Sequence, residues 1–387
     1  MTDKDHNPSS THPPLPPTSE AEQFSRLRLL RSRRVGVTTY KRLLTEHGTA
    51  QNALAALPEV ARAAGVQKYE VCPEAVVQAE LNAARAAGAR LIMQGTAAYP
   101  AHLNEIDDAP PFLWVLGDAG LLKRPMISLV GARNASSLGT RMAKALARDL
   151  GVAGYVVVSG LARGVDAAAH LAALPTGTVA VQAGGVDVVY PAENTELALE
   201  LAQTGLRLSE QPMGLQPMAR HFPSRNRIIS GLSRATVVVE AAAKSGSLIT
   251  ARDALDQGRD VLAVPGSPFD ARAAGCNQLI REGATLIRSA EDVLEAMAPL
   301  AEASPQLPLE PPLRAAKPPK PKTPLKEVAA LHRKILARLS PAPLAEDQLI
   351  RDLAIAPADV APALLDLEME GRISRRSGGL LSRTESA

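Results

Sequence analysis

Three parts of this chain combine small residues with a cation in the way that protein loops bind phosphate. The first is Gly131-Ala132-Arg133-Asn134, which follows an apolar run and precedes an amphipathic stretch. Small residues let backbone N–H groups approach an anion, and the N-terminus of a following helix adds positive potential. The segment matches neither G-x-G-x-x-G nor G-x-x-x-x-G-K-S/T. The sequence therefore gives little support to dinucleotide binding and none to phosphoryl transfer from ATP.

The second part is SGLARGVDAAAH, which places Arg163 between glycines at the end of another apolar run. A guanidinium presented on a flexible loop suits a phosphate group. Asp166 and His170 follow in the same segment. We interpret them as a helix cap and a helix-surface residue rather than as functional groups.

The third part is an acid-free stretch in a chain whose charges are otherwise nearly balanced. No Asp or Glu occurs from Gln211 to Val239, whereas the stretch holds Arg220, Arg225, Arg227 and Arg234. A solvated basic helix face is the ordinary interpretation of such a run. The length of this one favours an anionic partner instead.

A further loop, Lys244-Ser245-Gly246-Ser247, comes after the next apolar run and opens another helical stretch. Its amides, hydroxyls and single cation repeat the pattern that surrounds phosphate oxygens. Glu240, at the end of that run, has the chemistry of an acid or base. We interpret it as a carboxylate that balances the neighbouring arginines.

The sequence contains no set of residues that predicts catalysis. The seven histidines are scattered, without H-E-x-x-H or a Cys/His cluster, so we expect no metal site. Cys276 is interpreted as a small packed residue, because nothing near it in sequence would lower its pKa. We therefore predict no catalytic residue, no metal and no cofactor.

The elements that position these loops are short apolar runs that alternate with alanine-rich amphipathic stretches. The runs are residues 126–130, 155–159, 178–183, 235–240 and 261–266. Runs of this kind are typical of strands buried on both faces of a parallel sheet. The alternation predicts an α/β fold with a Rossmann-like, doubly wound and mainly parallel sheet, in which ligands bind beyond the carboxyl ends of the strands.

Proline-rich segments and changes in composition divide the 387 residues into several regions. We predict a disordered tail (1–19), a small all-helical domain (20–92), the Rossmann-like domain (93–300), a proline-rich linker (301–324) and a C-terminal domain (325–387) whose three helices and hairpin indicate a winged helix. Five arginines of the helical domain are interpreted as a solvated helix face: Arg26, Arg28, Arg31, Arg33 and Arg34.

The charge balance and the cysteine count exclude some classes of protein. Lys and Arg number 43 against 40 Asp and Glu, so any nucleic-acid role must rest on a local patch. Two cysteines exclude a disulfide framework and fit a reducing compartment. Without a signal peptide or an apolar run long enough for a membrane span, we expect a cytoplasmic protein.

Taken together, several motifs resemble the family of DNA-processing protein A (DprA or Smf). They are SGLARGVDAAAH, GGVDVVYPAEN (184–194), FPSRNRIISGLS (222–233), SGSLITA and GRDVLAVPG (258–266), which occur in order within residues 95–290. The resemblance implies a sterile-alpha-motif or helix-hairpin-helix-like N-terminal domain and a winged helix at the C-terminus.

The resemblance also implies a function. It predicts a non-catalytic protein that binds single-stranded DNA, protects incoming DNA during natural transformation, loads the RecA recombinase and acts as a homodimer. The implied DNA-binding residues are Gly131, Arg133, Arg163, Phe222, Arg225, Asn226, Arg227, Lys244, Ser245 and Gly246. Aromatic residues make up only 3% of the chain, so we expect Phe222 to be the only stacking platform.

Two alternatives remain open at this point. Glu240 near a glycine-containing loop would suit a Rossmann-type nucleotide phosphoribohydrolase, although the P-G-G-x-G-T run of that group is missing. A winged-helix transcription regulator would use the hairpin residues Arg372, Arg375, Arg376 and Arg383 on duplex phosphates. The acidic residues of the third helix, Asp366, Glu368 and Glu370, would repel DNA, and for that reason we favour protein contact for this domain.

Overall fold

The computed structural model describes residues 19–298, 325–340, 342–369, 371–376 and 379–384. The chain divides into two units, residues 1–301 and 302–387, and each is described by itself. The predicted tail, except Ser19, and the predicted linker lie outside the described residues. No helix in the described ranges combines the length and apolarity that a bilayer crossing requires.

The first unit begins with a helical region, as the sequence predicts. Its helices are α1 (Glu20–Arg31), α2 (Val37–His47), α3 (Ala50–Ala63) and α4 (Glu74–Ala87). Leu27, Leu43 and Leu57 pack together in its core, where they join Phe112 and Trp114 from the sheet. The helical region and the sheet therefore share one apolar cluster.

The prediction of a solvated arginine face holds for the exposed Arg33 and Arg34 but is wrong for the arginines of α1. Arg31 donates to both carboxylate oxygens of Glu80 on α4, at 2.9 and 2.7 Å. The same carboxylate accepts a hydrogen bond from the indole of Trp114 at 2.7 Å, and the Glu80 side chain is only 5% exposed. Arg28 donates to the Cys72 carbonyl, so these guanidiniums fasten α1 to neighbouring elements.

The sheet is mainly parallel and confirms the predicted fold class. The described residues form nine strands in the order β1-β2-β6-β5-β4-β3-β7-β8-β9. Their bounds are β1 (Arg90–Met93), β2 (Phe112–Gly117), β3 (Met126–Gly131), β4 (Val156–Ser159), β5 (Thr178–Val181), β6 (Leu206–Ser209), β7 (Ala235–Val239), β8 (Asp260–Ala263) and β9 (Thr285–Leu286). From β6 to β9 the neighbours are parallel, while β1 and β2 are antiparallel at one edge.

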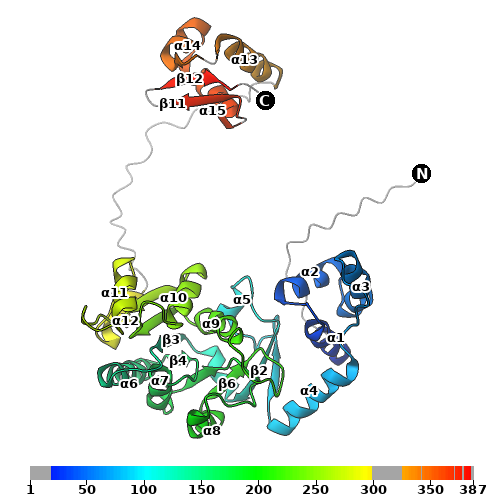
Figure 1. The fold of residues 1–387 in the computed structure, drawn as a ribbon, viewed down its shortest axis with the longest axis vertical. Helices are drawn as coiled ribbons and strands as arrows, with labels where there is room; N and C mark the ends of the chain where they lie inside the picture. Colours follow the sequence, from blue (N-terminus) through cyan, green and yellow to red (C-terminus); the bar gives the residue numbers. More distant parts are fainter. Residues whose placement is uncertain (1–18, 299–324, 341, 370, 377–378, 385–387) are drawn as a thin grey trace, which may run out of the picture. The chain divides into compact units, whose positions relative to one another are not determined.

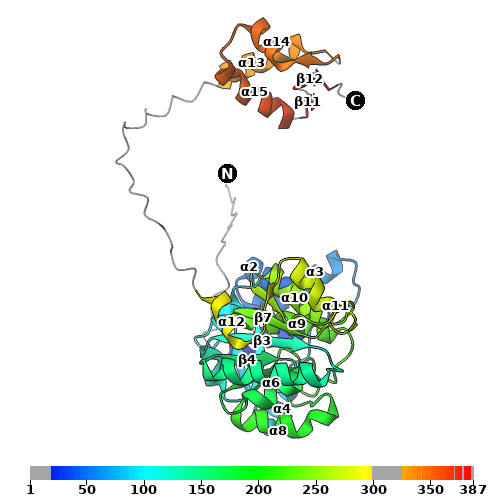
Figure 2. The ribbon, with the colours of Figure 1, turned by 90° about the vertical axis from the view of Figure 1, so that its left-hand side faces the viewer.

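Helices cover both faces of this sheet, because the strands bury alternate residues in opposite directions. Ile127 and Leu129 of β3 belong to the cluster formed with α6 (Ser137–Val152), α7 (Val165–Ala173) and α12 (Ala290–Met297). Met126 and Val130 belong to the cluster formed with α9 (His221–Leu232), α10 (Ser247–Asp256) and α11 (Ala274–Arg281). In Figures 1 and 2, α6 lies on one side of β3 and β4, and α9 and α10 lie on the other. The remaining helical segments of this unit are α5 (Ala101–Asn104), η1 (Ala119–Lys123), η2 (Ala192–Asn194) and α8 (Thr195–Thr204).

The order of the strands reverses between β3 and β7. The chain runs from β3 outward to β4, β5 and β6, and then returns through α9 to place β7 on the other side of β3. A crevice forms outside the carboxyl ends of parallel strands at such a reversal. The topology thus marks the ends of β3 and β7 as the place for a ligand.

The second unit has the predicted three helices and hairpin. Its elements are α13 (Leu325–Arg338), β10 (Leu344–Ala345), α14 (Glu346–Leu353), α15 (Pro357–Met369), β11 (Ile373–Arg376) and β12 (Leu380–Arg383). Ile335, Leu349 and Leu364 pack with the hairpin residues Ile373 and Leu381. The short strand β10, which the sequence did not reveal, pairs with β12.

One arginine that the regulator hypothesis assigned to DNA is already paired within this unit. Arg375 donates to Glu346 on α14 and lies 3.4 Å from a carboxylate oxygen of Glu368 on α15. Glu370 lies outside the described residues. The two acids offset the charge of Arg375, which weakens its attraction to a phosphate.

Candidate nucleic-acid interface

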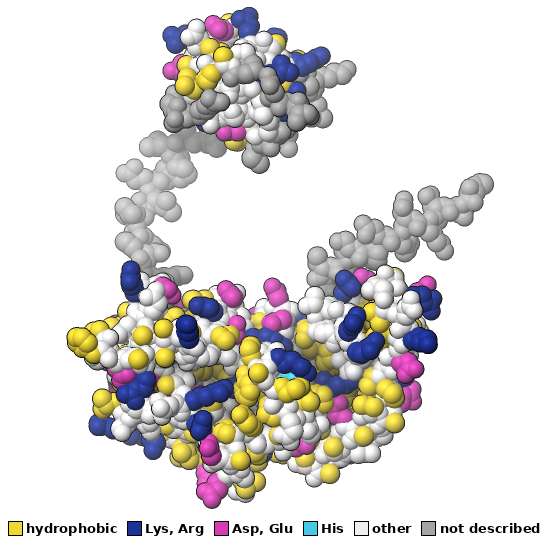
Figure 3. All heavy atoms as spheres, viewed as in Figure 1, with side chains coloured by type: hydrophobic (Ala, Val, Ile, Leu, Met, Phe, Trp, Pro, Cys, Tyr) yellow, Lys and Arg dark blue, Asp and Glu magenta, His cyan; other side chains and the backbone are white. Residues whose placement is uncertain are grey.

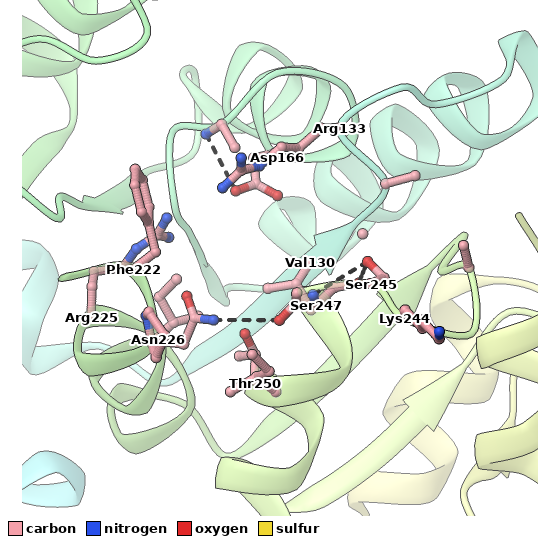
Figure 4. A pocket seen from close by; sticks show the side chains of 18 of the residues that line it. Val130, Arg133, Asp166, Phe222, Arg225, Asn226, Lys244, Ser245, Ser247 and Thr250 are labelled. Carbon is pink, nitrogen blue, oxygen red and sulfur yellow. Dashed lines mark hydrogen bonds between the residues drawn. The ribbon is translucent and has the colours of Figure 1, made fainter. Parts of the chain in front are cut away.

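A cavity of about 720 Å³ lies at the carboxyl ends of β3 and β7. Figure 4 shows its lining, with α9 on one side and the loop after β7 on the other. The lining includes Gly131, Arg133, Phe222, Arg225, Asn226, Lys244, Ser245 and Gly246. Most of the residues predicted from sequence are therefore brought together at the strand-order reversal.

The loop after β3 is held in place by backbone proximity and by a carboxylate. A Cβ on Gly131 would lie 1.9 Å from the carbonyl oxygen of Val239, so only glycine lets the two strand ends approach this closely. Glu240 accepts hydrogen bonds from the amide (2.8 Å) and the hydroxyl of Ser136. Ser136 in turn caps α6 by accepting from the amide of Gly139 at 3.0 Å. Glu240 therefore fixes this loop. Within the described residues it forms no ion pair with an arginine, although its charge helps to raise the pKa of Arg272.

Arg225 and Asp166 are buried at the base of the cavity, where their opposite charges act on each other. Each residue is only 6% exposed. Burial lowers the pKa of Arg225 to about 10, against the opposing effect of Asp166, so the guanidinium stays charged at neutral pH. Burial also raises the pKa of Asp166, and the Arg225 charge opposes that rise. A Cβ on Gly160 would lie 1.4 Å from Nη1 of Arg225, so the guanidinium needs a glycine at that position.

Asp166 also organises the loop that precedes its helix. Its carboxylate accepts from the amides of Gly160 (3.1 Å) and Ala162 (3.3 Å), upstream of α7. These contacts tie the end of β4 to the start of α7. The prediction that Asp166 caps the helix is wrong, because Gly164 is the N-cap of α7 and Asp166 instead stabilises the loop that carries Arg163.

Two residues that we interpreted as non-functional are buried in the core. His170 is fully buried, in contrast to the predicted helix-surface position, and its Nδ1 lies 2.7 Å from the hydroxyl of Thr178. Burial and the charge of Arg225 lower the pKa of His170 to about 3. Cys276 is also fully buried, and burial raises the pKa of its thiol to about 11, which confirms that it is a packed residue.

Phe222 is in contact with a cation and with a second aromatic ring. The guanidinium carbon of Arg133 lies 5.2 Å from the centroid of the Phe222 ring. The ring of Tyr190 has its centroid 5.8 Å from that of Phe222, at an interplanar angle of 52°. Tyr190 is 51% exposed, so Phe222 has an aromatic neighbour that the sequence analysis missed.

The structure separates Arg227 from Arg225. Residues two apart on an α-helix point in directions that differ by about 200°. Nε of Arg227 lies 3.1 Å from Asp108 and its Nη2 lies 2.6 Å from Glu210, while the side chain is only 14% exposed. Arg227 is not among the cavity residues and stays a DNA ligand only as a prediction.

Other cations complete the surroundings of the cavity. Arg163 lines an adjoining hollow rather than the main cavity. Arg272 lines the main cavity and was missed, although the end of β8 provides the same positional signal as the ends of β3 and β7. In Figure 3, dark blue Lys and Arg side chains lie over the part of the molecule that holds α9 and α10.

Asn226 bridges two sides of the cavity. Its side-chain amide donates to the carbonyl of Gly246 at 3.4 Å, which links α9 to the loop after β7. The hydroxyls of Ser245 and Ser247 lie 2.7 Å apart in that loop. These contacts, drawn in Figure 4, hold Lys244 and its neighbouring amides at the rim.

Comparison with known proteins identifies the family. The family described as DNA recombination-mediator protein A matches residues 90–298, which cover the sheet and its helices. The chain belongs to the DprA family. The DprA-like N-terminal HHH domain matches residues 20–83, and the DprA winged helix domain matches residues 317–379. The predicted resemblance is thereby confirmed.

Relatives and solved structures agree with this assignment. The chain is 48% identical to DNA processing protein DprA of Streptococcus pneumoniae over 198 residues, which are 51% of this chain and 70% of that protein. It is 45% identical to the Bacillus subtilis DprA over 218 residues, 56% of this chain and 73% of that protein. The X-ray structure of the S. pneumoniae DprA covers 70% of this chain and 97% of its own, with a TM-score of 0.60 and 36% identity.

A second solved structure that is similar to this chain is of DNA processing protein A from Helicobacter pylori. It was described for the single-stranded-DNA binding mode of that protein. That structure covers 54% of this chain and 94% of its own, with a TM-score of 0.50 and 30% identity.

Proposed function

We propose that this DprA-family chain is a recombination mediator that binds single-stranded DNA in the cavity at the ends of β3 and β7. The observation that carries the proposal is the charge of the lining. Among the described residues that line the cavity, Arg133, Arg225, Lys244 and Arg272 are basic, and Asp166 is the sole acid. Asp166 is buried with Arg225, and Arg272 is paired with Asp270 at 3.0 Å, so the accessible positive charge of the cavity comes from Arg133 and Lys244.

The remaining lining suits a polynucleotide backbone. The loops after β3 and β7 and the first turns of α9 and α10 bring amides and hydroxyls toward one volume. Phosphate contacts in nucleic-acid complexes come from such groups together with Arg and Lys. We propose Gly131, Arg133, Phe222, Arg225, Asn226, Lys244, Ser245 and Gly246 as the DNA contacts of this cavity.

The aromatic component favours an unpaired strand over a duplex. The bases of a duplex stack on each other and offer no free face to a side chain, whereas unpaired bases stack on protein rings. Phe222 lines the cavity beside Arg133. We therefore expect single-strand binding with little sequence preference.

The decisive experiment is a salt titration of oligothymidylate binding, followed by fluorescence anisotropy. Each phosphate contact on a single strand contributes about 0.7 to the slope of log K against log salt. The variant Arg133→Ala/Lys244→Ala should flatten that slope by about 1.4 and weaken binding about tenfold or more at low salt. Both side chains are exposed, so the fold should be unaffected.

The matched control is Arg141→Ala/Lys144→Ala, which removes the same charge from exposed positions of α6 outside the cavity. This control should keep nearly the wild-type slope. Equal slopes for both double variants, or no binding of single strands by the wild type, would contradict the proposal.

The finer role that we propose follows from membership of the family. As a cytoplasmic homodimer, the protein would protect incoming DNA during natural transformation and load the RecA recombinase onto it. Stimulation of RecA filament assembly on protein-coated single strands tests the loading step. Sedimentation at micromolar concentration tests the homodimer.

We further propose that the protein is not an enzyme. The phosphoribohydrolase alternative depends on Glu240, whose carboxylate is engaged by Ser136 and is not part of the described cavity lining. Release of free base from nucleoside monophosphates, abolished by Glu240→Gln, would reverse this conclusion.

For the winged helix we propose a protein contact, and deletion of residues 325–387 should leave single-strand affinity within about threefold of wild type.

A further inference from the structure

A second hollow, of about 220 Å³, adjoins the main cavity. The two share Arg133, Ala162, Phe222 and Arg225 in their linings. A strand that leaves the main cavity on this side must therefore pass Phe222 and enter the second hollow. Arg163, which lines this hollow, is also one of the DNA-binding residues predicted from sequence.

The second hollow is assembled from two loops that are fastened to each other. The side-chain amide of Asn194 donates to the carbonyl oxygens of Leu161 (2.9 Å) and Ala162 (3.2 Å). This double contact joins the segment that begins at Tyr190 to the loop that carries Arg163. The carboxylate of Asp166 braces the same loop from below.

Beyond the residues that it shares with the main cavity, the hollow is lined by one cation, Arg163, one anion, Glu193, and one ring, Tyr190. Nε of Arg163 lies 3.6 Å from Oε2 of Glu193, and the two side chains are 61% and 63% exposed. That separation is longer than a normal hydrogen bond, and exposed pairs of this type contribute little to stability. Tyr190 lies beside Phe222, so the rings of the two hollows adjoin.

We propose that this hollow is a second nucleotide subsite and that Glu193 is its internal competitor. In this arrangement a base stacks on Tyr190, and the phosphate next to it takes the place of the Glu193 carboxylate on Arg163. A carboxylate and a phosphate oxygen compete for the same guanidinium donors. The inference rests on the proposed function, because the occupant is the next nucleotide of the strand held in the main cavity.

Substitution of Glu193 tests the proposal, because it should increase the affinity for single strands rather than decrease it. Glu193→Gln frees Arg163 and removes a negative charge from the hollow. With oligothymidylates of about 4 to about 16 nucleotides, we expect about three- to tenfold tighter binding at low salt for the longer strands. The shortest strands, which fill only the main cavity, should gain little.

The matched control is Glu196→Gln, an exposed residue in the first turn of α8 that does not line the hollow. It changes the net charge equally, so it reports the long-range electrostatic effect alone. The gain of Glu193→Gln must also vanish in an Arg163→Ala background. Equal effects of the two glutamine variants, or a gain that persists without Arg163, would overturn the proposal.

The ring is tested separately. Tyr190→Leu should weaken the binding of long strands roughly tenfold, at the lower end of what a stacked base contributes. Tyr190→Phe keeps the ring and should bind as the wild type does. Loss in both variants would assign the effect to the hydroxyl and reject stacking.

The outcomes separate this inference from the function on which it rests. If wild-type protein binds short strands with the expected salt slope and the variants of Glu193 and Tyr190 show no dependence on strand length, the subsite is rejected and the proposed function stands. If Arg133→Ala/Lys244→Ala binds like the wild type, the proposed function fails first.

Discussion

The arginines of α1 and those around the cavity are the same kind of residue in opposite situations. Arg31 donates twice to Glu80, a carboxylate that is itself almost fully buried. Arg133 and Lys244 line a cavity whose only described acid, Asp166, is buried with another arginine. The difference teaches that carboxylates nearby in space, rather than the density of arginine in sequence, decide whether a cation is available to a ligand.

A sharper version of this contrast occurs within one helix. Arg225 and Arg227 are two residues apart on α9, yet Arg225 borders the cavity whereas Arg227 is paired with Asp108 and Glu210. Rotation along the helix separates their environments. Substitutions at these positions test the comparison directly.

The largest effect is expected at Glu80. Glu80→Gln leaves the buried guanidinium of Arg31 without its counter-charge, and breaking a buried pair of this kind costs about 3 to 5 kcal/mol of unfolding free energy. Urea unfolding measures the loss. The control is Glu74→Gln, because the Glu74 side chain is 71% exposed where it pairs with Arg28, and it should cost about 1 kcal/mol or less.

Single-strand affinity of folded Glu80→Gln protein should equal that of the wild type. A specific loss of DNA affinity, with unfolding free energy unchanged, would break the division between structural and ligand-binding arginines.

The next effect is expected at Arg227. Arg227→Ala removes the partner of Glu210 and Asp108, and we expect a loss of about 2 to 4 kcal/mol of unfolding free energy. The salt slope of single-strand binding should be unchanged. By contrast, Arg133→Ala should reduce that slope by about 0.7 with unfolding free energy preserved. A reduced slope in Arg227→Ala would return this residue to the DNA interface.

A smaller effect per unit of pH is expected from His170. Its pKa falls from the ordinary 6.5 to about 3 in the folded protein, so the unfolded chain binds the proton first as the solution becomes acidic. Stability supplied by the neutral ring is complete above about pH 6.5 and is lost as the pH falls toward 3, by at most about 1.4 kcal/mol per unit. Urea unfolding at pH 7, 6 and 5 measures this slope.

The variant His170→Asn should show a shallower dependence on pH over the same range. The charge of Arg225 also opposes protonation of His170. An identical pH profile of the unfolding free energy in the variant would show that titration of this ring does not contribute to the pH dependence of stability.

The central parallel strands could be predicted because their apolar runs are nearly continuous. Strand β6 was not predicted, because Arg207 and Ser209 interrupt its apolar pattern. Both are buried, and Arg207 donates to Oε1 of Gln182 (3.0 Å) and to the carbonyl of Val186 (2.6 Å). Partners that lie in another loop cannot be read from the strand itself.

The same limit applies to the cavity. Loops after β3 and β7 were predicted because their position at strand ends is a local property of the sequence. The proximity of Tyr190 to Phe222, and the pairing of Arg227 with Asp108, depend on tertiary contacts between distant segments. Residue type and spacing carry no signal for such contacts.

The two hydrogen bonds that Glu240 accepts from Ser136 have a consequence for the kinetics of DNA binding. A loop that is already anchored at both its amide and its hydroxyl needs no rearrangement when a polymer arrives. Encounter should then be limited by diffusion and ionic attraction, so added salt would slow capture more than it speeds release. Stopped-flow traces at several ionic strengths should accordingly show a single phase, with no slow isomerisation step after contact.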